Sequence, residues 1–166
     1  MLTQIAKRQS IRLYQDKEIP DAVLEEILQA AFRAPTSKNR QDWNFFLITD
    51  EKILRDISVF PSYVGFKTCK AAIIVLSDTS FCQDDASYSF IDAGAACQNI
   101  LLEGMNQGIA SCWCAIAPHK EKEEFFRDYF HLEEALLPIA AISLGYAAQE
   151  RPYEERFDLE KVRYYR

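Results

Sequence analysis

The residues best suited to hold an anion lie near the start of the sequence, in residues 7–12, which read KRQSIR. Arg8 and Arg12 are four positions apart, so on a helical turn they would share one face. Arginine binds phosphate through paired, charge-assisted hydrogen bonds, and the Ser10 hydroxyl adds a further polar contact. The segment therefore suits a phosphate group, although the same pattern is typical of a solvated basic surface.

Residues 34–43 form a second polar segment, between an apolar helical pattern and an aromatic stretch. Its hydroxyl and amide side chains suit a heteroaromatic ring or a ribityl chain as hydrogen-bond partners. A loop without a ligand is the alternative. Residues 92–102 carry small side chains that permit close helix–helix approach, either in the core or at a dimer interface.

The cysteines do not form a disulfide framework, because there are five of them at irregular spacings. Cys112 and Cys114 make a C-x-C pair, without the second pair that a zinc site would need. We expect the cysteines to be small buried hydrophobic residues, with a peripheral redox or metal role as the alternative. The set consists of Cys69, Cys82, Cys97, Cys112 and Cys114.

Several classes of site are missing from the sequence. The two histidines, His119 and His131, lie in no metal-binding motif, and no nucleophile elbow or P-loop is present. Five glycines supply no G-x-G-x-x-G, so any phosphate must be bound by cationic side chains. A net charge of -6 argues against nucleic acid and membrane partners. No long apolar run indicates a signal peptide or a membrane span, so we expect a cytoplasmic protein.

The apolar pattern predicts helices that alternate with strands around a central sheet, in one domain spanning residues 1–166. Residues 71–77 are continuously apolar and indicate a strand that is buried on both faces. The expected helices span residues 21–34, 51–60, 90–107 and 121–130. The expected strands span residues 43–49, 71–77, 109–116 and 138–145. The tail, residues 147–166, shows no periodicity.

Taken in order, these segments resemble the nitroreductase family of flavoproteins. Residues 8–12 are similar to its R-R-S-[IV]-R opening, and residues 34–43 to A-P-S-x-x-N-x-Q-P-W. Residues 92–102 and 108–113 are similar to D-x-G-x-A-x-x-N-x-L-L and G-L-G-x-x-W, and residues 144–146 to [IL]-G-[YH]. The resemblance spans almost the whole chain.

The resemblance implies an α+β fold with three α/β/α layers and a mixed central sheet flanked by helices. It further implies a homodimer with FMN at each of two interface sites. The activity implied is an FMN-dependent oxidoreduction in which NADH or NADPH donates a hydride to flavin N5. A nitroaromatic, a quinone or a similar electron-poor acceptor then takes it in a ping-pong cycle. No catalytic side chain is required.

The resemblance also implies the residues that hold the cofactor. The flavin phosphate and ribityl chain would be held by Arg8, Gln9, Ser10 and Arg12, with Arg156 as a further phosphate ligand and Arg151 as its alternative. Pro35, Thr36, Ser37 and Asn39 would approach from the other subunit. The backbone around Cys114 and Ala115 would face N5, and Gly145 would lie near the cofactor.

The sequence departs from the family pattern at three places. Gln9 replaces a basic residue, and Cys114-Ala115 lacks an acidic residue found in some members. Asp42 stands where proline is common, so we expect a less rigid loop. Two alternatives remain open. One is specialised flavin chemistry, such as dehalogenation, flavin destruction or dehydrogenation. The other is a flavin-binding or sensor module whose tail clasps a partner through Tyr153, Phe157, Tyr164 and Tyr165.

Overall fold

The computed structural model describes residues 1–81, 87–152 and 154–166, so Cys82 and Tyr153 lie outside the described residues. The helices are α1 (Thr3–Lys7), α2 (Asp21–Ala31), α3 (Glu51–Ile57), α4 (Ser87–Asn106) and α5 (Lys120–Phe130). The strands are β1 (Trp43–Ile48), β2 (Ala71–Asp78), β3 (Ala110–Ala115) and β4 (Leu136–Gly145). Single turns of 3-10 helix span Ser37–Asn39, Thr79–Phe81 and Leu159–Lys161, and a longer 3-10 segment spans Pro61–Lys67. None of the helices described is long and apolar enough to cross a bilayer.

Within the described part of the chain, four strands form one sheet in the order β1-β2-β4-β3. All three ladders between neighbouring strands are antiparallel. The α+β fold class is confirmed, but the expected mixed sheet is antiparallel among the described strands. Parallel pairing occurs beside it, at an isolated bridge between Ser10 and Ser111 that lies outside the named strands.

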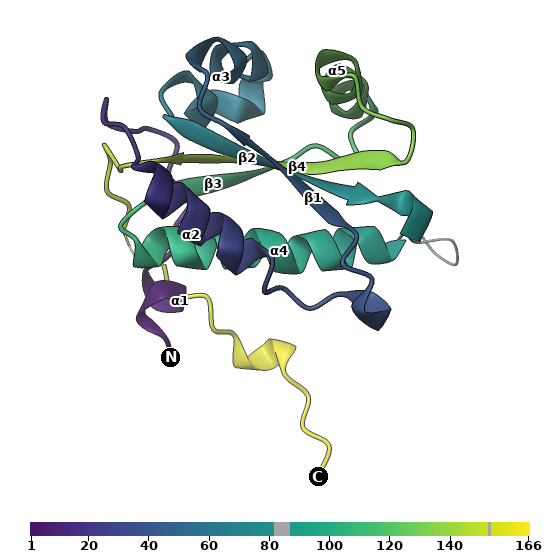
Figure 1. Ribbon diagram of the computed structural model, residues 1–166. Coiled ribbons are helices and arrows are strands. Elements are labelled where there is room, and N and C mark those ends of the chain that lie inside the picture. The colour runs from purple at the N-terminus through teal and green to yellow at the C-terminus, as the bar shows by residue number, and fades with distance from the viewer. Residues whose placement is uncertain (82–86, 153) are drawn as a thin grey trace.

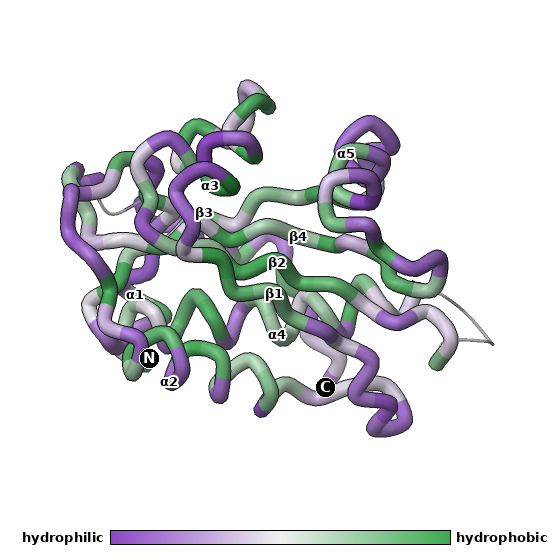
Figure 2. The backbone as a smooth tube through the Cα atoms, turned by 45° about the horizontal axis from the view of Figure 1, so that its top comes forward, coloured by the Kyte–Doolittle hydropathy of each residue, from purple (hydrophilic) through white to green (hydrophobic). Residues whose placement is uncertain are grey.

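Helices cover both faces of the sheet, as Figure 1 shows: α3 and α5 lie on one face, and α2 and α4 lie on the other. The side chains of β2 alternate between the two layers, because successive residues of a strand point to opposite faces. Ile74 and Leu76 belong to the core under α3 and α5, whereas Ile73 and Val75 belong to the core over α2 and α4. The expectation of a strand buried on both faces is confirmed, and hydrophobic residues follow the central strands in Figure 2.

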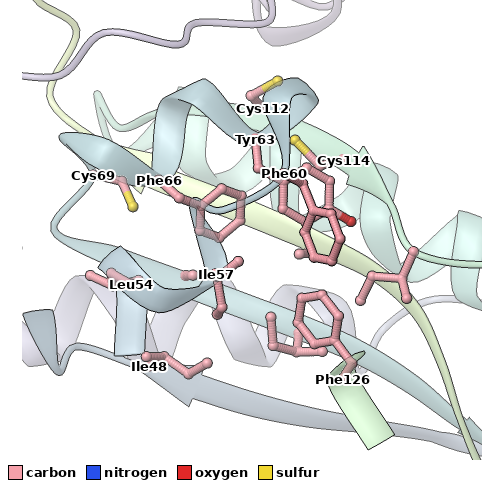
Figure 3. Packing of buried hydrophobic residues seen from close by; sticks show 14 of the residues in the cluster. Ile48, Leu54, Ile57, Phe60, Tyr63, Phe66, Cys69, Cys112, Cys114 and Phe126 are labelled. Carbon is pink, nitrogen blue, oxygen red and sulfur yellow. The ribbon is translucent and has the colours of Figure 1, made fainter. Parts of the chain in front are cut away.

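The core between the sheet, α3 and α5 is strongly aromatic (Figure 3). Tyr63 and Phe66 stack with ring centroids 5.3 Å apart, and Phe126 packs against Tyr63. Cys112 and Cys114 reach this core from β3. Each cysteine that the structure describes is buried and free, which confirms the packing role expected of Cys69, Cys97, Cys112 and Cys114.

The N-terminal segment corrects one expectation. Helix α1 ends at Lys7, and Arg8 already has extended backbone angles of φ -60° and ψ 125°. Arg8 and Arg12 therefore do not share a helical face. The segment runs beside the start of β3 instead, where the Ile11 amide donates to the Ser111 carbonyl at 3.0 Å. Pairing with a distant strand overrides the local helical spacing.

Candidate functional site

A cavity of about 690 Å³ lies between the N-terminal segment and the start of the C-terminal tail. Arg8, Arg12, Arg151 and Arg156 all line it, so guanidinium groups from the two ends of the chain converge on one space. The rest of the lining comes from Met1, Ile5, Ala6, Gln9, Ser10, Pro152, Glu154, Glu155 and Phe157. The structure thus gathers every phosphate ligand expected from the sequence, and it includes both Arg151 and Arg156.

The cavity walls are joined by contacts between segments that are far apart in the sequence. The Gln9 side-chain amide donates to the Pro152 carbonyl at 3.1 Å, which ties the N-terminal segment to the tail. Gln9 therefore helps to build the wall of the cavity, a role that the motif comparison did not reveal. Ser10 is fixed by its bridge to Ser111 at the start of β3.

Acidic side chains at the edge of the cavity compete for the arginines. Glu154 Oε2 lies 3.7 Å from Arg156 Nη2, and both side chains are largely exposed. Exposed ion pairs of this kind contribute little free energy, about 0–1 kcal/mol. An anion with several oxygens can therefore compete well for the Arg156 guanidinium.

Cys112 lies near Ser10 and Arg12, which line the arginine cavity, whereas Cys112, Cys114 and Ala115 are not among its lining residues. Cys112 and Cys114 are two positions apart on β3, so their side chains project from the same face of the strand (Figure 3). The neighbouring Cys114, the positive charge of Arg12 and the Ser10 hydroxyl lower the pKa of Cys112 below the ordinary thiol value, against the effect of burial. The neighbouring Cys112 and burial raise the pKa of Cys114. Their C-x-C spacing on a strand was the only sequence signal for this pair.

The end of β3 is held by two donors. The Ala115 carbonyl accepts from the Tyr63 hydroxyl at 2.8 Å and from Lys122 Nζ at 3.1 Å. The next residue, Ile116, directs its amide toward β4, where it donates to Ile139. The N–H and C=O of one residue in an antiparallel strand point to the same side. The Ala115 amide therefore faces the open edge of β3, where the sequence predicts contact with flavin N5.

Gly145 lies at the other end of that ladder, paired with Ala110. A Cβ at position 145 would stand 2.8 Å from ring atoms of Tyr14. Glycine at this position therefore allows Tyr14 to lie against the end of β4. Gly145 is not among the residues that line the arginine cavity.

The predicted contacts from residues 35–39 lie at the opposite end of α4. The Ser37 amide donates to Asp92 near the start of this helix, whereas Gln4, from α1, donates to Asn106 at its end. Asp92 and Asn106 are fourteen positions apart, which is about 21 Å at ~1.5 Å per residue. Within one chain, the structure does not bring Pro35, Thr36, Ser37 and Asn39 to the arginine cavity.

The loop that carries these residues has an unusual backbone. Lys38, Asn39 and Gln41 have φ values of 54°, 55° and 54°, in the left-handed region that side chains disfavour. Such residues persist where surrounding contacts enforce them, and they concentrate at functional sites. The Gln41 amide donates to Thr36 Oγ1 at 3.0 Å, which closes the loop on itself.

Asp42 corrects the expectation of a looser loop. Its side chain is buried and accepts a hydrogen bond from the Ser77 hydroxyl, and its carbonyl accepts from the Asp78 amide at 2.7 Å. The residue that replaces the usual proline thus fixes the end of the loop to β2.

Comparisons with known proteins agree with this geometry. The family model described as the nitroreductase family matches residues 5–62 and 63–146. An Archaeoglobus fulgidus protein assigned as an NADH dehydrogenase/NAD(P)H nitroreductase is 32% identical over 165 residues, covering 97% of this chain and 95% of that protein.

Solved structures have the same fold. An FMN-dependent nitroreductase from Clostridium difficile superposes with a TM-score of 0.90 at 26% identity, over 99% of this chain and 98% of that one. A protein assigned as a nitroreductase from Desulfovibrio desulfuricans, in complex with FMN, gives a TM-score of 0.85 at 26% identity, over 96% and 92% of the two chains. On its sequence and its structure, this chain belongs to the nitroreductase family.

Proposed function

We propose that the chain is an FMN-dependent oxidoreductase that takes a hydride from NADH or NADPH and passes it to an electron-poor acceptor, such as a nitroaromatic or a quinone. The donor and the acceptor use the same site in turn, so the cycle is ping-pong. The observation that carries this proposal is the convergence of Arg8, Arg12, Arg151 and Arg156 on one cavity.

The cavity fits the phosphate and ribityl part of a flavin mononucleotide. A phosphate monoester carries a charge of about -1.5 to -2 at neutral pH, which suits several guanidinium groups with hydroxyl and amide donors beside them. The volume, about 690 Å³, is within the usual range for small-molecule sites of about 300–1,000 Å³. Arg8 and Arg12 would hold the phosphate with Ser10, and Arg151 and Arg156 would close over it from the tail.

FMN, when bound, supplies the hydride chemistry. The protein's part is to bind, orient and exclude water. The Ala115 amide, on the open edge of β3, is placed to donate a hydrogen bond to the flavin ring. Tyr63 and Lys122 donate to the carbonyl of the same residue, so they support this end of β3 on the edge that the amide faces.

The active form that we propose is a homodimer with each site divided between two subunits. On the outward side of α4, Ile91, Ala95, Gln98 and Leu102 recur at helical spacing, and Ile91 is 65% exposed. Two copies related by a two-fold axis across this stripe would pack α4 antiparallel to its copy. The Ser37 loop of one subunit would then lie near the arginine cavity of the other, which accounts for the separation of about 21 Å within one chain.

The C-terminal tail supports the same assembly. It leaves the α2–α4 side of the molecule and extends away from it (Figure 1). Phe157, Tyr164 and Tyr165 are exposed along it, and Tyr165 is 95% exposed. Aromatic side chains bury large apolar areas when they find a partner surface. We propose that this tail packs against a second copy of the chain.

The experiment that tests the proposal is purification followed by an absorbance spectrum and a mass measurement in solution. A flavin spectrum, about one FMN per chain and the mass of a dimer are expected. Initial rates with NADH or NADPH against nitroaromatic and quinone acceptors should give the parallel double-reciprocal lines of a ping-pong cycle.

Each alternative has its own outcome. A colourless protein that does not bind added FMN would overturn the proposal. Flavin that NAD(P)H reduces, without turnover of these acceptors, would favour the specialised chemistry. Bound flavin that NAD(P)H does not reduce would favour a sensor module.

A further inference from the structure

The ammonium group of Lys122 lies at the open edge of β3, on the side that the Ala115 amide faces. Lys122, near the start of α5, is half-buried, and its Nζ donates to the Ala115 carbonyl at 3.1 Å. The N–H and C=O of Ala115 point to the same side of the strand, because the next amide, of Ile116, donates to β4. A cation is therefore held at the edge of the sheet that we assign to the flavin ring.

The contacts described for this ammonium group leave its charge available. Besides the Ala115 carbonyl, it lies 4.8 Å from the centre of the Tyr63 ring, and neither group carries a net charge. An ammonium group has three N–H donors, and the carbonyl accepts from one of them. Lys120, two positions earlier on α5, differs, because its Nζ lies 3.7 Å from Glu124 Oε1.

Lys122 is well separated from the arginine cavity. That cavity reaches β3 at Ser10, which forms a bridge with Ser111. Ser111 and Ala115 are four positions apart on β3, which is about 14 Å at ~3.4 Å per residue. Lys122 thus lies at the opposite end of this edge from the arginines that we assign to the phosphate, and it suits a second anion.

We propose that Lys122 binds the carboxylate of aromatic electron acceptors, so that the site prefers acceptors with a negative charge on the ring. This inference rests on the proposed function, in which the acceptor replaces the nicotinamide beside the flavin. A carboxylate attached directly to an aromatic ring can reach the ammonium group while the ring lies against the cofactor. The phosphates of NADH are separated from its nicotinamide by a ribose, and the nicotinamide itself carries a neutral amide in place of the carboxylate.

Binding of benzoate and benzamide to the oxidised, flavin-loaded protein tests the role of charge. The two molecules have nearly the same shape and differ in charge. Their dissociation constants can be measured from the change in flavin absorbance. The preference for benzoate over benzamide should fall by about tenfold in Lys122→Met, because a hydrogen bond to a charged group is lost. Lys122→Arg, which keeps the charge, should retain most of the preference.

Two control variants separate the charge from structural support. Lys120→Met removes the same charge from the same helix, at a side chain that is largely exposed and paired with Glu124. Tyr63→Phe removes the other donor to the Ala115 carbonyl without changing any charge. Both variants should keep the preference of the wild type. Added salt should reduce this preference in the wild type and leave Lys122→Met unaffected, because ions screen the attraction.

A kinetic measurement assigns the anion to the acceptor. Stopped-flow reoxidation of the NADH-reduced protein by p-nitrobenzoate and by p-nitrobenzamide should show the same loss of preference in Lys122→Met, about tenfold in the ratio of the two rate constants. Reduction by NADH should change much less. A large loss with NADH that is absent with N-benzyl-dihydronicotinamide, which has no phosphates, would assign Lys122 to the donor and overturn the proposal.

The remaining outcomes separate this inference from the proposed function. An unchanged preference in Lys122→Met would overturn the inference, and so would an equal loss in Lys120→Met, since the effect would then be one of net charge. Weaker binding of both benzoate and benzamide by the same factor would show that Lys122 only supports the fold. A protein that does not bind FMN would overturn the proposed function, and this inference with it.

Discussion

The ring of Tyr14 lies directly against the backbone of Gly145, in the space that a side chain at position 145 would occupy. The Tyr14 hydroxyl also donates to the Ile11 carbonyl at 2.6 Å, so the same side chain fixes the segment between Arg8 and Arg12. The packing of one tyrosine against one glycine thus connects the end of β4 to the position of the arginine cavity.

The substitution Gly145→Ala should displace Tyr14, because the added Cβ would stand 2.8 Å from ring atoms. We expect the free energy of unfolding to fall by about 1–3 kcal/mol, the usual cost of overpacking, and FMN affinity to fall with it. Thermal melting and flavin titration would measure both. Gly94→Ala is the matched control, since its Cβ would meet Trp113 at an ordinary 3.7 Å. An unchanged melting temperature in Gly145→Ala would contradict the packing argument.

The substitutions Arg8→Gln and Arg12→Gln should each weaken FMN binding by about tenfold or more, because a charge-assisted hydrogen bond contributes about 1.5–3 kcal/mol. Riboflavin, which lacks the phosphate, should lose far less affinity in the same variants. Arg33→Gln is the control, since Arg33 is exposed and lies outside the cavity. Equal losses for FMN and riboflavin would show that the arginines do not contact the phosphate.

Local patterns in the sequence predicted the elements well. The apolar run at 71–77 became β2 at Ala71–Asp78, and the helix expected at 90–107 became α4 at Ser87–Asn106. Both patterns are long and are stabilised by burial on most sides, so local and tertiary preferences agree. The prediction that Arg8 and Arg12 share a helical face was wrong, because spacing alone cannot distinguish a helical turn from an extended segment that pairs with β3.

Part of the lining of the arginine cavity could be predicted, because Arg8, Gln9, Ser10 and Arg12 lie in one short motif. The contacts that support them could not, since they join residues that are distant in the sequence. Tyr14 with Gly145, Gln9 with Pro152, and Ser37 with Asp92 are contacts of this kind. The division of the site between two subunits remains a prediction.

The thiol of Cys112 should ionise at a lower pH than an ordinary thiol, because the neighbouring Cys114 and the positive charge of Arg12 lower its pKa. A lowered pKa stabilises the folded state above the ordinary thiol pKa, and this stabilisation is lost as the pH falls through the lowered value. Ultraviolet absorbance of the thiolate should follow the titration. Cys112→Ser should abolish it, and Cys114→Ser should move the midpoint upward. The buried Cys97 supplies the control variant Cys97→Ser, which should leave the midpoint unchanged.

Removal of residues 157–166 should weaken the dimer, because it deletes the exposed aromatic side chains but keeps Arg156. We expect the dimer dissociation constant, measured by analytical ultracentrifugation, to rise by about tenfold, equivalent to about 1.4 kcal/mol. The substitution Phe157→Ser in the full chain should act in the same direction. A truncated chain that dimerises as tightly as the full chain would show that the tail does not contact the partner.

Tyr63 and Lys122 donate to the same carbonyl, so their contributions to the position of the Ala115 end of β3 should not be additive. Tyr63→Phe or Lys122→Met alone leaves one donor in place, and we expect a loss of about threefold or less in the rate at which NADH reduces bound flavin. The double variant removes both donors from this end of β3, and its loss should exceed the product of the single losses, as coupled neighbours usually show. Stopped-flow reduction at saturating NADH would measure these rates, with FMN affinity as a check that binding is retained. Additive effects would mean that the two donors do not act together to position this end of β3.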